Sequence, residues 1–270
     1  MQDAQRDEDR DRGPAGVRGA DHGVGEAAPA GADGPRRGDR GAAVRTPFDI
    51  GPAPARTAGR ERRRAGTVEL STGVPGTLLV VPEVDGPVPL LVFFHGSGGT
   101  PQQSLDLVGA AAERHGTAVL APRSTAHTWD VVVGGPGPDV AAVRRALAEA
   151  AGHVDVEASA LGVGGFSDGA SYALTVGLAN PGTVGCVLAF SPGFVVDGVP
   201  GRRPRCFVSH GTADRVLPID RTSRVVVPRL RGSGYDVQYR EFDGGHEVPA
   251  DAVEAAFAWW LTPGAGAGGG

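Results

Sequence analysis

Lysine is missing from this sequence of 270 residues, so all 26 of its basic residues are arginines. Methionine occurs once, at Met1, and cysteine only at Cys186 and Cys206. We interpret the missing lysine and methionine as biased composition rather than as a sign of particular chemistry. Two cysteines cannot build a disulfide framework, and no C-x-x-C or paired Cys/His spacing predicts a zinc site. We therefore expect two free thiols, each buried in a strand, and no metal.

The sequence also has no long apolar run. No stretch reaches the roughly 18 apolar residues that a membrane helix needs. The N-terminus lacks the charged, apolar and small-residue regions of a secretory signal. We expect a cytoplasmic protein without an integral membrane segment. If the true start site differs from Met1, the missing secretory signal carries little information.

Large apolar residues are almost absent before Phe48. A segment of this kind buries too little apolar surface to offset its ordering entropy, so residues 1–65 are predicted to be a disordered tail. Alternatives for this segment are a start site assigned too far upstream, or an arginine-rich arm that binds an anionic surface. The candidate for the folded, functional domain is residues 66–262, and the Gly/Ala-rich residues 263–270 are predicted to be disordered. Residues 66–270 hold 13 arginines and 20 acidic residues, a net charge of −7, which argues against nucleic acid as a partner.

From residue 67 onward, short apolar runs bounded by Gly and Pro alternate with amphipathic segments. This pattern predicts an α/β fold with a mostly parallel sheet covered by helices on both faces. The expected strands are 77–82, 89–95, 117–122, 159–164, 186–191, 206–210 and 235–242, and the expected helices are 104–115, one capped by Asp139, 170–180, 220–231 and 249–261. Only about a dozen residues separate Ser191 from Arg205, so we expect no large cap domain and an open cleft.

The most informative motif is Gly165-Phe166-Ser167-Asp168-Gly169. It is a G-x-S-x-G pentapeptide at a predicted turn from strand to helix, where a serine hydroxyl can be presented on a strained backbone. Glycine is abundant, with 44 residues, so the pattern alone is also compatible with an ordinary Gly-rich loop. The interpretation of Ser167 as a nucleophile needs a base and an acid elsewhere.

Histidine and aspartate candidates follow the last two predicted strands. His246 lies in Gly-Gly-His-Glu-Val-Pro just after the last strand, and Asp214 lies in His-Gly-Thr-Ala-Asp-Arg-Val-Leu-Pro after the strand before it. A serine nucleophile needs a histidine base, which in turn needs a carboxylate that fixes its tautomer. We predict that Ser167, Asp214 and His246 form this triad.

A glycine-rich turn after the strand 89–95 predicts an oxyanion hole. It reads His95-Gly96-Ser97-Gly98-Gly99 and precedes a helix. We expect the Ser97 and Asp168 amides to donate, with the Gly98 amide as a substitute for that of Ser97. His95 and His210 each precede a glycine at a strand end, and we expect them to be structural hydrogen-bonding residues.

Two aromatic residues are candidates for a substrate pocket. Trp129 lies in the longest loop at the carboxyl end of the predicted sheet, residues 123–139, and Phe194 follows the strand 186–191. An aromatic residue packed beneath a long loop is an alternative interpretation of Trp129. The triad mechanism requires neither a metal nor an organic cofactor.

Taken together, these four motifs resemble the phospholipase/carboxylesterase family of small α/β-hydrolases. This family is related to acyl-protein thioesterases and to dienelactone-hydrolase-like and polyhydroxybutyrate-depolymerase-like esterases. The resemblance runs from about Thr77 to Leu261 and implies an α/β-hydrolase fold with the triad named above. One departure is Asp168-Gly169-Ala170, where the thioesterases often have Gln-Gly-Gly.

The expected activity is cleavage of small-molecule carboxylic esters through an acyl-enzyme, as in a carboxylesterase or lysophospholipase. Two alternatives remain open: a thioesterase or small peptidase of the same fold, and a non-catalytic binding protein of that fold. The sequence leaves the oligomeric state open.

Overall fold

A computed structural model of the chain describes residues 46–53 and 65–262, without the side chain of residue 158. Contacts group the chain into two units, residues 1–42 and 43–270, and all described residues belong to the second. Most of the predicted tail 1–65, and all of the predicted tail 263–270, therefore lie outside the described residues.

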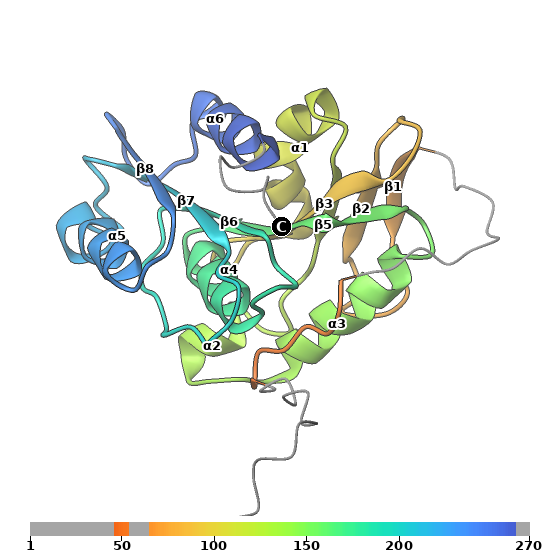
Figure 1. The fold of residues 1–270 in the computed structure, drawn as a ribbon, viewed down its shortest axis with the longest axis horizontal. Coiled ribbons are helices and arrows are strands. Elements are labelled where there is room, and N and C mark those ends of the chain that lie inside the picture. The colour runs from red at the N-terminus through yellow and green to blue at the C-terminus, as the bar shows by residue number, and fades with distance from the viewer. Residues whose placement is uncertain (1–45, 54–64, 263–270) are drawn as a thin grey trace, which may run out of the picture. The chain divides into compact units, whose positions relative to one another are not determined.

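The centre of the fold is an eight-stranded sheet with the order β1-β2-β4-β3-β5-β6-β7-β8 (Figure 1). The pairs β1/β2 and β2/β4 are antiparallel, and all other neighbours are parallel. The strands are β1 (Gly66–Glu69), β2 (Leu78–Val81), β3 (Val88–Phe94), β4 (Ala118–Ala121), β5 (Val156–Phe166), β6 (Cys186–Phe190), β7 (Arg205–Gly211) and β8 (Val237–Phe242).

Helices cover both faces of this sheet. One face carries α1 (Pro101–Arg114) and α6 (Ala250–Leu261), and the other carries α3 (Pro138–Ala150), α4 (Asp168–Ala179) and α5 (Ser223–Gly232) (Figure 1). Two short elements, α2 (Asp130–Val133) and the 3₁₀ helix η1 (Ile219–Arg221), lie in connecting segments. This is the predicted α/β architecture. The connection between β6 and β7 contains neither a helix nor a strand, so no cap is inserted at that point.

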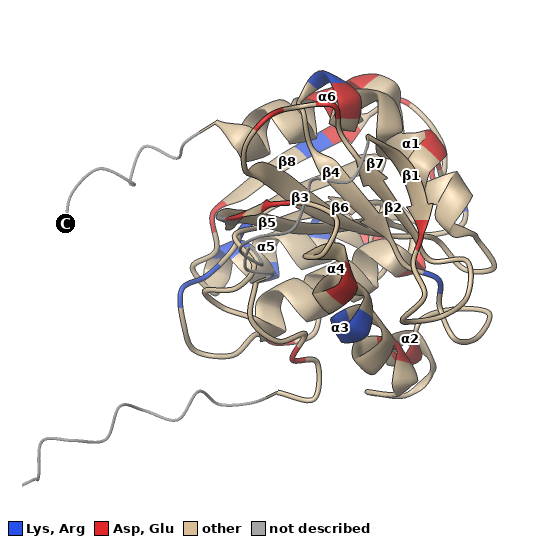
Figure 2. Cartoon of the chain, turned by 90° about the vertical axis from the view of Figure 1, so that its right-hand side faces the viewer, with Lys and Arg blue, Asp and Glu red and all other residues tan. Residues whose placement is uncertain are grey.

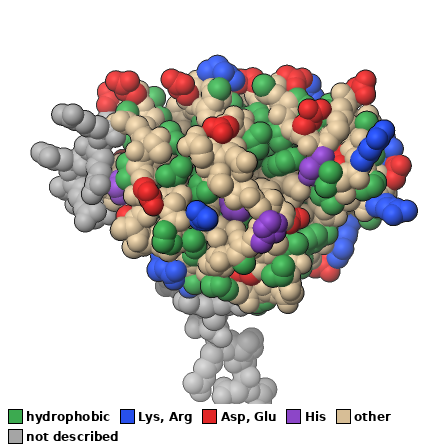
Figure 3. Space-filling view, turned by 180° about the vertical axis from the view of Figure 1, so that it is seen from behind, with side chains coloured by type: hydrophobic (Ala, Val, Ile, Leu, Met, Phe, Trp, Pro, Cys, Tyr) green, Lys and Arg blue, Asp and Glu red, His purple; other side chains and the backbone are tan. Residues whose placement is uncertain are grey.

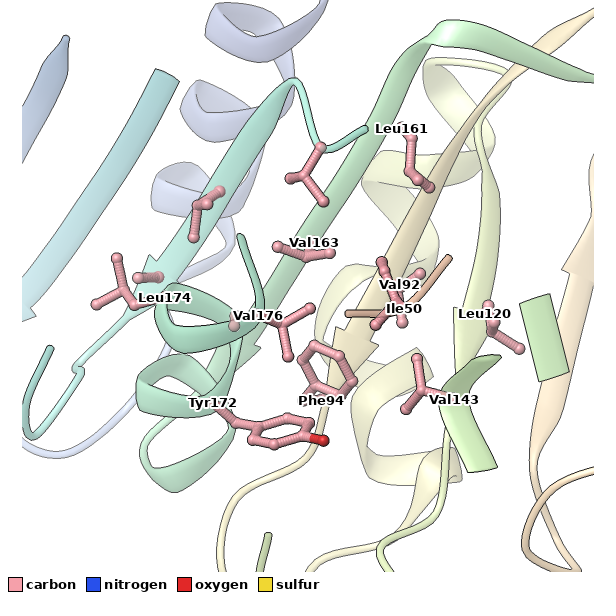
Figure 4. Close-up of a cluster of buried hydrophobic side chains, with 14 of the residues drawn as sticks. Ile50, Val92, Phe94, Leu120, Val143, Leu161, Val163, Tyr172, Leu174 and Val176 are labelled. Atoms are coloured by element: carbon pink, nitrogen blue, oxygen red, sulfur yellow. The ribbon is translucent and has the colours of Figure 1, made fainter. Parts of the chain in front are cut away.

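β3 shows why the central strands read as continuous apolar runs. Its side chains alternate between two core clusters, with Leu90, Val92 and Phe94 in one and Leu91 and Phe93 in the other. Because each face is covered by helices, both sets of side chains are removed from water. The first cluster is drawn in Figure 4, where Phe94 lies beside Tyr172 of α4.

Three details differ from the predicted elements. The sequence did not predict the short strand β1 or the single-turn helix α2, because each has too few residues for a recognisable period. Asp139 does not cap α3, which begins at Pro138 after Gly137. Instead, the buried Asp139 carboxylate accepts hydrogen bonds from the Thr125 and Asp130 amides and fastens the loop before the helix.

Charged residues lie mainly on the helices and loops, while the strands are mostly uncharged (Figure 2). On the opposite side of the molecule from that in Figure 1, histidine and apolar side chains are exposed, and most charged side chains lie toward the rim (Figure 3). None of the helices in the described part of the chain is long and apolar enough to cross a membrane.

The segment 46–53 packs against the folded domain. The prediction that residues 1–65 form a disordered tail is therefore wrong for this segment. Ile50 is 2% exposed and joins the same core cluster as Val92 and Val176 (Figure 4). Asn180, which ends α4, fixes the segment: its Oδ1 accepts from the Ile50 amide at 3.0 Å, and its Nδ2 donates to the Phe48 carbonyl at 2.8 Å. Only two large apolar residues mark the segment in the sequence, too few to predict its docking.

We expect Asn180→Ala to lower the free energy of unfolding by about 2 kcal/mol, because it leaves buried backbone groups of the 46–53 segment without partners. Urea unfolding followed by circular dichroism measures the change. Thr46→Val is the matched control: it removes only a half-buried 3.3 Å bond to the Ala179 carbonyl and should cost less than about 1 kcal/mol. Equal stabilities of Asn180→Ala and the wild type would contradict the anchoring role.

Candidate active site

Ser167 lies between the end of β5 and the start of α4, in a backbone conformation that is rare for a residue with a side chain. Its φ is 58° and its ψ is −120°. The flanking glycines are required by close backbone approach. A Cβ on Gly169 would lie 2.2 Å from the Phe94 carbonyl oxygen, and a Cβ on Gly165 would lie 2.3 Å from the Gly169 carbonyl oxygen. The G-x-S-x-G spacing thus allows the first turn of α4 to press against the end of β3, with Ser167 at the crest of the turn.

The structure brings the three predicted triad residues together. His246 Nε2 lies 3.0 Å from Ser167 Oγ, and His246 Nδ1 lies 2.6 Å from Asp214 Oδ2. Because the carboxylate only accepts, Nδ1 carries the proton and donates a hydrogen bond to Asp214. Nε2 is then the acceptor that faces the serine hydroxyl. This is the tautomer that a general base acting on Ser167 requires.

Strand order explains how residues so far apart in sequence meet. Ser167 follows β5, Asp214 follows β7 and His246 follows β8, and all three strands are parallel and point to the same edge. The loops after β7 and β8 are joined by hydrogen bonds from the Thr212 amide to the Phe242 carbonyl and from the Ala213 amide to the Gly244 carbonyl, each 2.9 Å.

The Asp214 carboxylate is buried but well supplied with donors. Its Oδ1 accepts from the Val216 and Leu217 amides, both at 2.8 Å, and its Oδ2 accepts from His246. Burial by itself would raise the pKa of Asp214, but the hydrogen bonds from His246 and from these amides outweigh it and hold the pKa below its usual value. Asp214 is therefore an anion in the folded protein near neutral pH.

The predicted oxyanion hole is partly corrected. The Gly98 amide cannot act as a substitute donor, because it already donates to the His127 carbonyl at 2.7 Å. Within the described residues, no hydrogen bond occupies the amides of Ser97 or Asp168. Asp168 is the first residue of α4, so its N–H lies at the positive end of the helix dipole. Asp168 directly follows Ser167, and Ser97 follows Gly96, where an added Cβ would lie 3.5 Å from the Ser167 Cβ.

The prediction that Trp129 lines a substrate pocket is wrong. The side chain is fully buried, stacks on Tyr172 at 4.9 Å, and donates its indole N–H to the His95 carbonyl at 2.8 Å. The alternative interpretation, an aromatic residue beneath a long loop, is the one that the structure bears out. Phe194 is half-buried, and its amide lies 3.4 Å from Ser171 Oγ; its place in a pocket stays a prediction.

Sequence reasoning missed the supporting role of residues 124–129. This segment holds the turn after β3 through the Trp129 and His127 bonds above and through the Ser124 amide, which donates to His95 Nε2 at 3.2 Å. It also contacts the nucleophile helix, because Thr128 Oγ1 donates to Asp168 Oδ2 at 2.7 Å. No motif marks these contacts, since three of the four use backbone groups.

A cavity of about 400 Å³ is lined by the turn after β3, by α1 and by Phe166, the residue before Ser167. Its apolar walls are Phe166, whose ring lies 4.7 Å from that of His246, and Leu107 of α1. Gln103 and Asp106 of α1 also line it, together with Ser97 of the turn after β3. Leu107 lies four positions after Gln103, so the two side chains share one face of α1. This helical spacing is the only signal in the sequence that could have found Leu107.

The other predicted residues behave as expected from their surroundings. His95 Nδ1 contacts the Gly96 carbonyl at 2.7 Å, and His210 lies fully buried with both ring nitrogens in hydrogen bonds. Cys186 and Cys206 are free and buried, and burial raises the pKa of each thiol. The described residues contain no group of three or more His, Cys, Asp or Glu placed to hold a metal.

Comparison with known proteins agrees with this geometry. Residues 141–259 match the sequence model of the phospholipase/carboxylesterase family. The chain has the α/β-hydrolase fold. The matched segment contains Ser167, Asp214 and His246, and the family match with the fold indicates a serine hydrolase. No curated protein matches the sequence.

Solved structures of other hydrolases share the fold at low sequence identity. S-formylglutathione hydrolase from Staphylococcus aureus is 13% identical, with a TM-score of 0.59 over 75% of this chain and 99% of that chain. A carboxylesterase from Mesorhizobium loti is 20% identical, with a TM-score of 0.56 over 73% of this chain and 99% of the other. Esterase PE8 is 22% identical, with a TM-score of 0.53 over 70% and 96%.

The lowered pKa of Asp214 predicts a pH dependence of stability. A carboxylate whose folded pKa is below its unfolded value stabilises the fold above the unfolded pKa, and this contribution is lost as pH falls through the folded pKa. We therefore expect the wild type to lose stability on acidification more steeply than Asp214→Asn in this acidic range. Urea unfolding at a series of pH values measures both slopes, and equal slopes would show that Asp214 is not held ionised.

Proposed function

We propose that this hydrolase cleaves carboxylic esters through an acyl-enzyme on Ser167. The observation that carries the proposal is the continuous hydrogen-bonded path from Ser167 Oγ through His246 to the Asp214 carboxylate. It unites a nucleophile in a strained turn, a base in the required tautomer and an ionised acid in one chain of contacts.

In the first step, Ser167 Oγ attacks the ester carbonyl carbon while His246 Nε2 takes the hydroxyl proton. The resulting imidazolium is stabilised by the Asp214 carboxylate. When the C–O bond to the alcohol breaks, His246 returns that proton to the departing alkoxide. A water molecule, deprotonated by His246, then attacks the acyl-serine, and the acid and the free Ser167 hydroxyl are released.

The oxyanion of each tetrahedral intermediate needs donors that are already in place. We assign this role to the Ser97 and Asp168 amides, because both lie next to Ser167 and neither is used elsewhere in the described structure. The bonds from residues 127 and 129 fix the turn that presents Ser97. A rigid donor of this kind contributes about 10²- to 10³-fold to the rate.

We propose that the cavity next to Phe166 binds an acyl group of modest size. Its lining includes Ser97, which carries a proposed oxyanion donor, Phe166, which directly precedes Ser167, and Leu107. The apolar Phe166 and Leu107 suit a hydrocarbon chain, and none of the lining residues carries a positive charge that would attract a carboxylate or a phosphate. This supports neutral acyl groups over acyl groups with an anionic end.

Labelling of Ser167 tests the proposed function. A fluorophosphonate should label the wild type and not Ser167→Ala, and p-nitrophenyl butyrate hydrolysis should fall by at least about 10³-fold in that variant. Ser97→Ala is the matched control, because it keeps the proposed backbone donor and should stay within about threefold of the wild type. Retained labelling of Ser167→Ala would refute the nucleophile.

A panel of substrates separates the alternatives. We expect faster turnover of p-nitrophenyl esters than of matched thioesters or p-nitroanilides. A preference for the thioester or the anilide would favour a thioesterase or a peptidase instead. Absence of turnover for every substrate, with a folded protein, would favour a non-catalytic binding protein.

Filling the cavity should shorten the preferred acyl chain. We expect Leu107→Trp to lower kcat/KM for p-nitrophenyl octanoate relative to the acetate by about tenfold or more, since lost apolar contacts and steric overlap act only on the long chain. Ala110→Trp places the same side chain on an exposed position of α1 outside the cavity lining and should leave the ratio unchanged. An unchanged ratio in Leu107→Trp would show that the acyl chain lies elsewhere.

A further inference from the structure

A second histidine contacts the acid of the triad from behind. His210 is the penultimate residue of β7 and is fully buried. Its Nε2 lies 3.1 Å from Asp214 Oδ2, the same oxygen that accepts from His246. Neither the proton transfer to His246 nor the oxyanion hole uses this residue, and a buried titratable side chain needs another reason for its place.

The neighbours of His210 fix its tautomer. Besides Asp214 Oδ2, Nε2 lies 2.8 Å from the Leu217 carbonyl. Both are acceptors, so Nε2 must carry a proton, which the two oxygens share. Nδ1 lies 2.7 Å from Ser223 Oγ, and the hydroxyl can donate to it. Burial is the main cause that lowers the pKa of His210, so the ring is neutral at physiological pH with its single N–H directed at Asp214 and Leu217.

Hydrogen bonds link His210, the Asp214 carboxylate and the backbone of Leu217. The Leu217 amide donates to Asp214 Oδ1, while the Leu217 carbonyl accepts from His210. The imidazole therefore holds both the carboxylate and the turn 214–217 that supplies its other donors. Ser223, at the start of α5, fixes the ring in turn, so the acid is tied to a helix as well as to its own loop.

We infer that His210 is a positioning residue for the proposed reaction: its Nε2–H fixes the Asp214 carboxylate in the orientation that directs His246 toward Ser167. This inference rests on the proposed function. Two consequences follow from the geometry. The N–H orients the carboxylate, and it withdraws part of the negative charge that stabilises the His246 imidazolium. Glu241, the neighbour of His210 on β8, also interacts electrostatically with His210 and is paired with Arg224 of α5 at 2.6 Å.

Two substitutions separate positioning from packing. Gln at position 210 places an amide N–H near the position of Nε2, whereas Leu fills similar space without a donor. We expect His210→Leu to lower kcat about tenfold with KM changed less than twofold, and to raise the pKa of the acidic limb of the kcat/KM profile by about 0.5 unit, because the unshared carboxylate then stabilises the imidazolium more strongly. His210→Gln should recover most of kcat and return the limb toward its wild-type position.

An NMR titration of His246 measures the same effect without turnover. The pKa of its imidazole should rise in His210→Leu relative to the wild type and to His210→Gln, in the absence of any substrate. If the wild type neither labels with fluorophosphonate nor turns over esters, the proposed function fails, and this titration still decides the positioning role. The two failures are therefore distinguishable.

Ser223→Ala keeps the test decisive if His210→Leu does not fold. It leaves the imidazole in place and removes only the partner of Nδ1, so it should shift the titration in the same direction by a smaller amount. The inference is overturned if the His246 titration of the folded variants is unmoved, or if Gln and Leu at position 210 reduce kcat equally, since a purely structural role predicts both results.

Discussion

The close approach of the first turn of α4 to the end of β3 is the constraint on which the rest of the site depends. Gly169 lies where a Cβ would be 2.2 Å from the Phe94 carbonyl oxygen, so helix and strand are in backbone contact. That contact sets the position of Ser167, the direction of the Asp168 N–H, and the distance between this N–H and the turn that begins at His95. The nucleophile and both proposed oxyanion donors therefore depend on this one contact.

The surrounding groups are arranged to keep this contact rigid. On one side, the indole of Trp129 and the backbone of residues 124–128 fasten the turn after β3. On the other, the bonds between the loops after β7 and β8 hold Asp214 beside His246. The reacting groups thus come from three parallel strands, while their supports come from loops that approach from the outside. Electrostatic stabilisation of a transition state needs such preorganisation, because donors that must first reorient contribute less.

The sequence predicted the α/β sheet and the set of residues that meet at its edge, because both depend on local signals. Apolar runs of strand length mark β3, β6 and β7, and short motifs after strand ends mark Ser167, Asp214 and His246. What could not be predicted depends on which partner a backbone group selects in three dimensions. No local signal indicates that the Gly98 amide donates to the loop carbonyl of His127. Trp129 is fully buried although its loop is long. Likewise, the docking of Ile50 depends on one asparagine 130 positions away.

That asparagine has a mechanical consequence. α4 carries Ser167 at its N-terminal end and Asn180 at its C-terminal end, and Asn180 grips the 46–53 segment that lies ahead of the whole sheet in the sequence. The helix is therefore clamped at both ends, by the backbone contact with β3 at one and by the chain's own leading segment at the other. The docking of residues 46–53 and the placement of Ser167 are therefore coupled through the two ends of one twelve-residue helix.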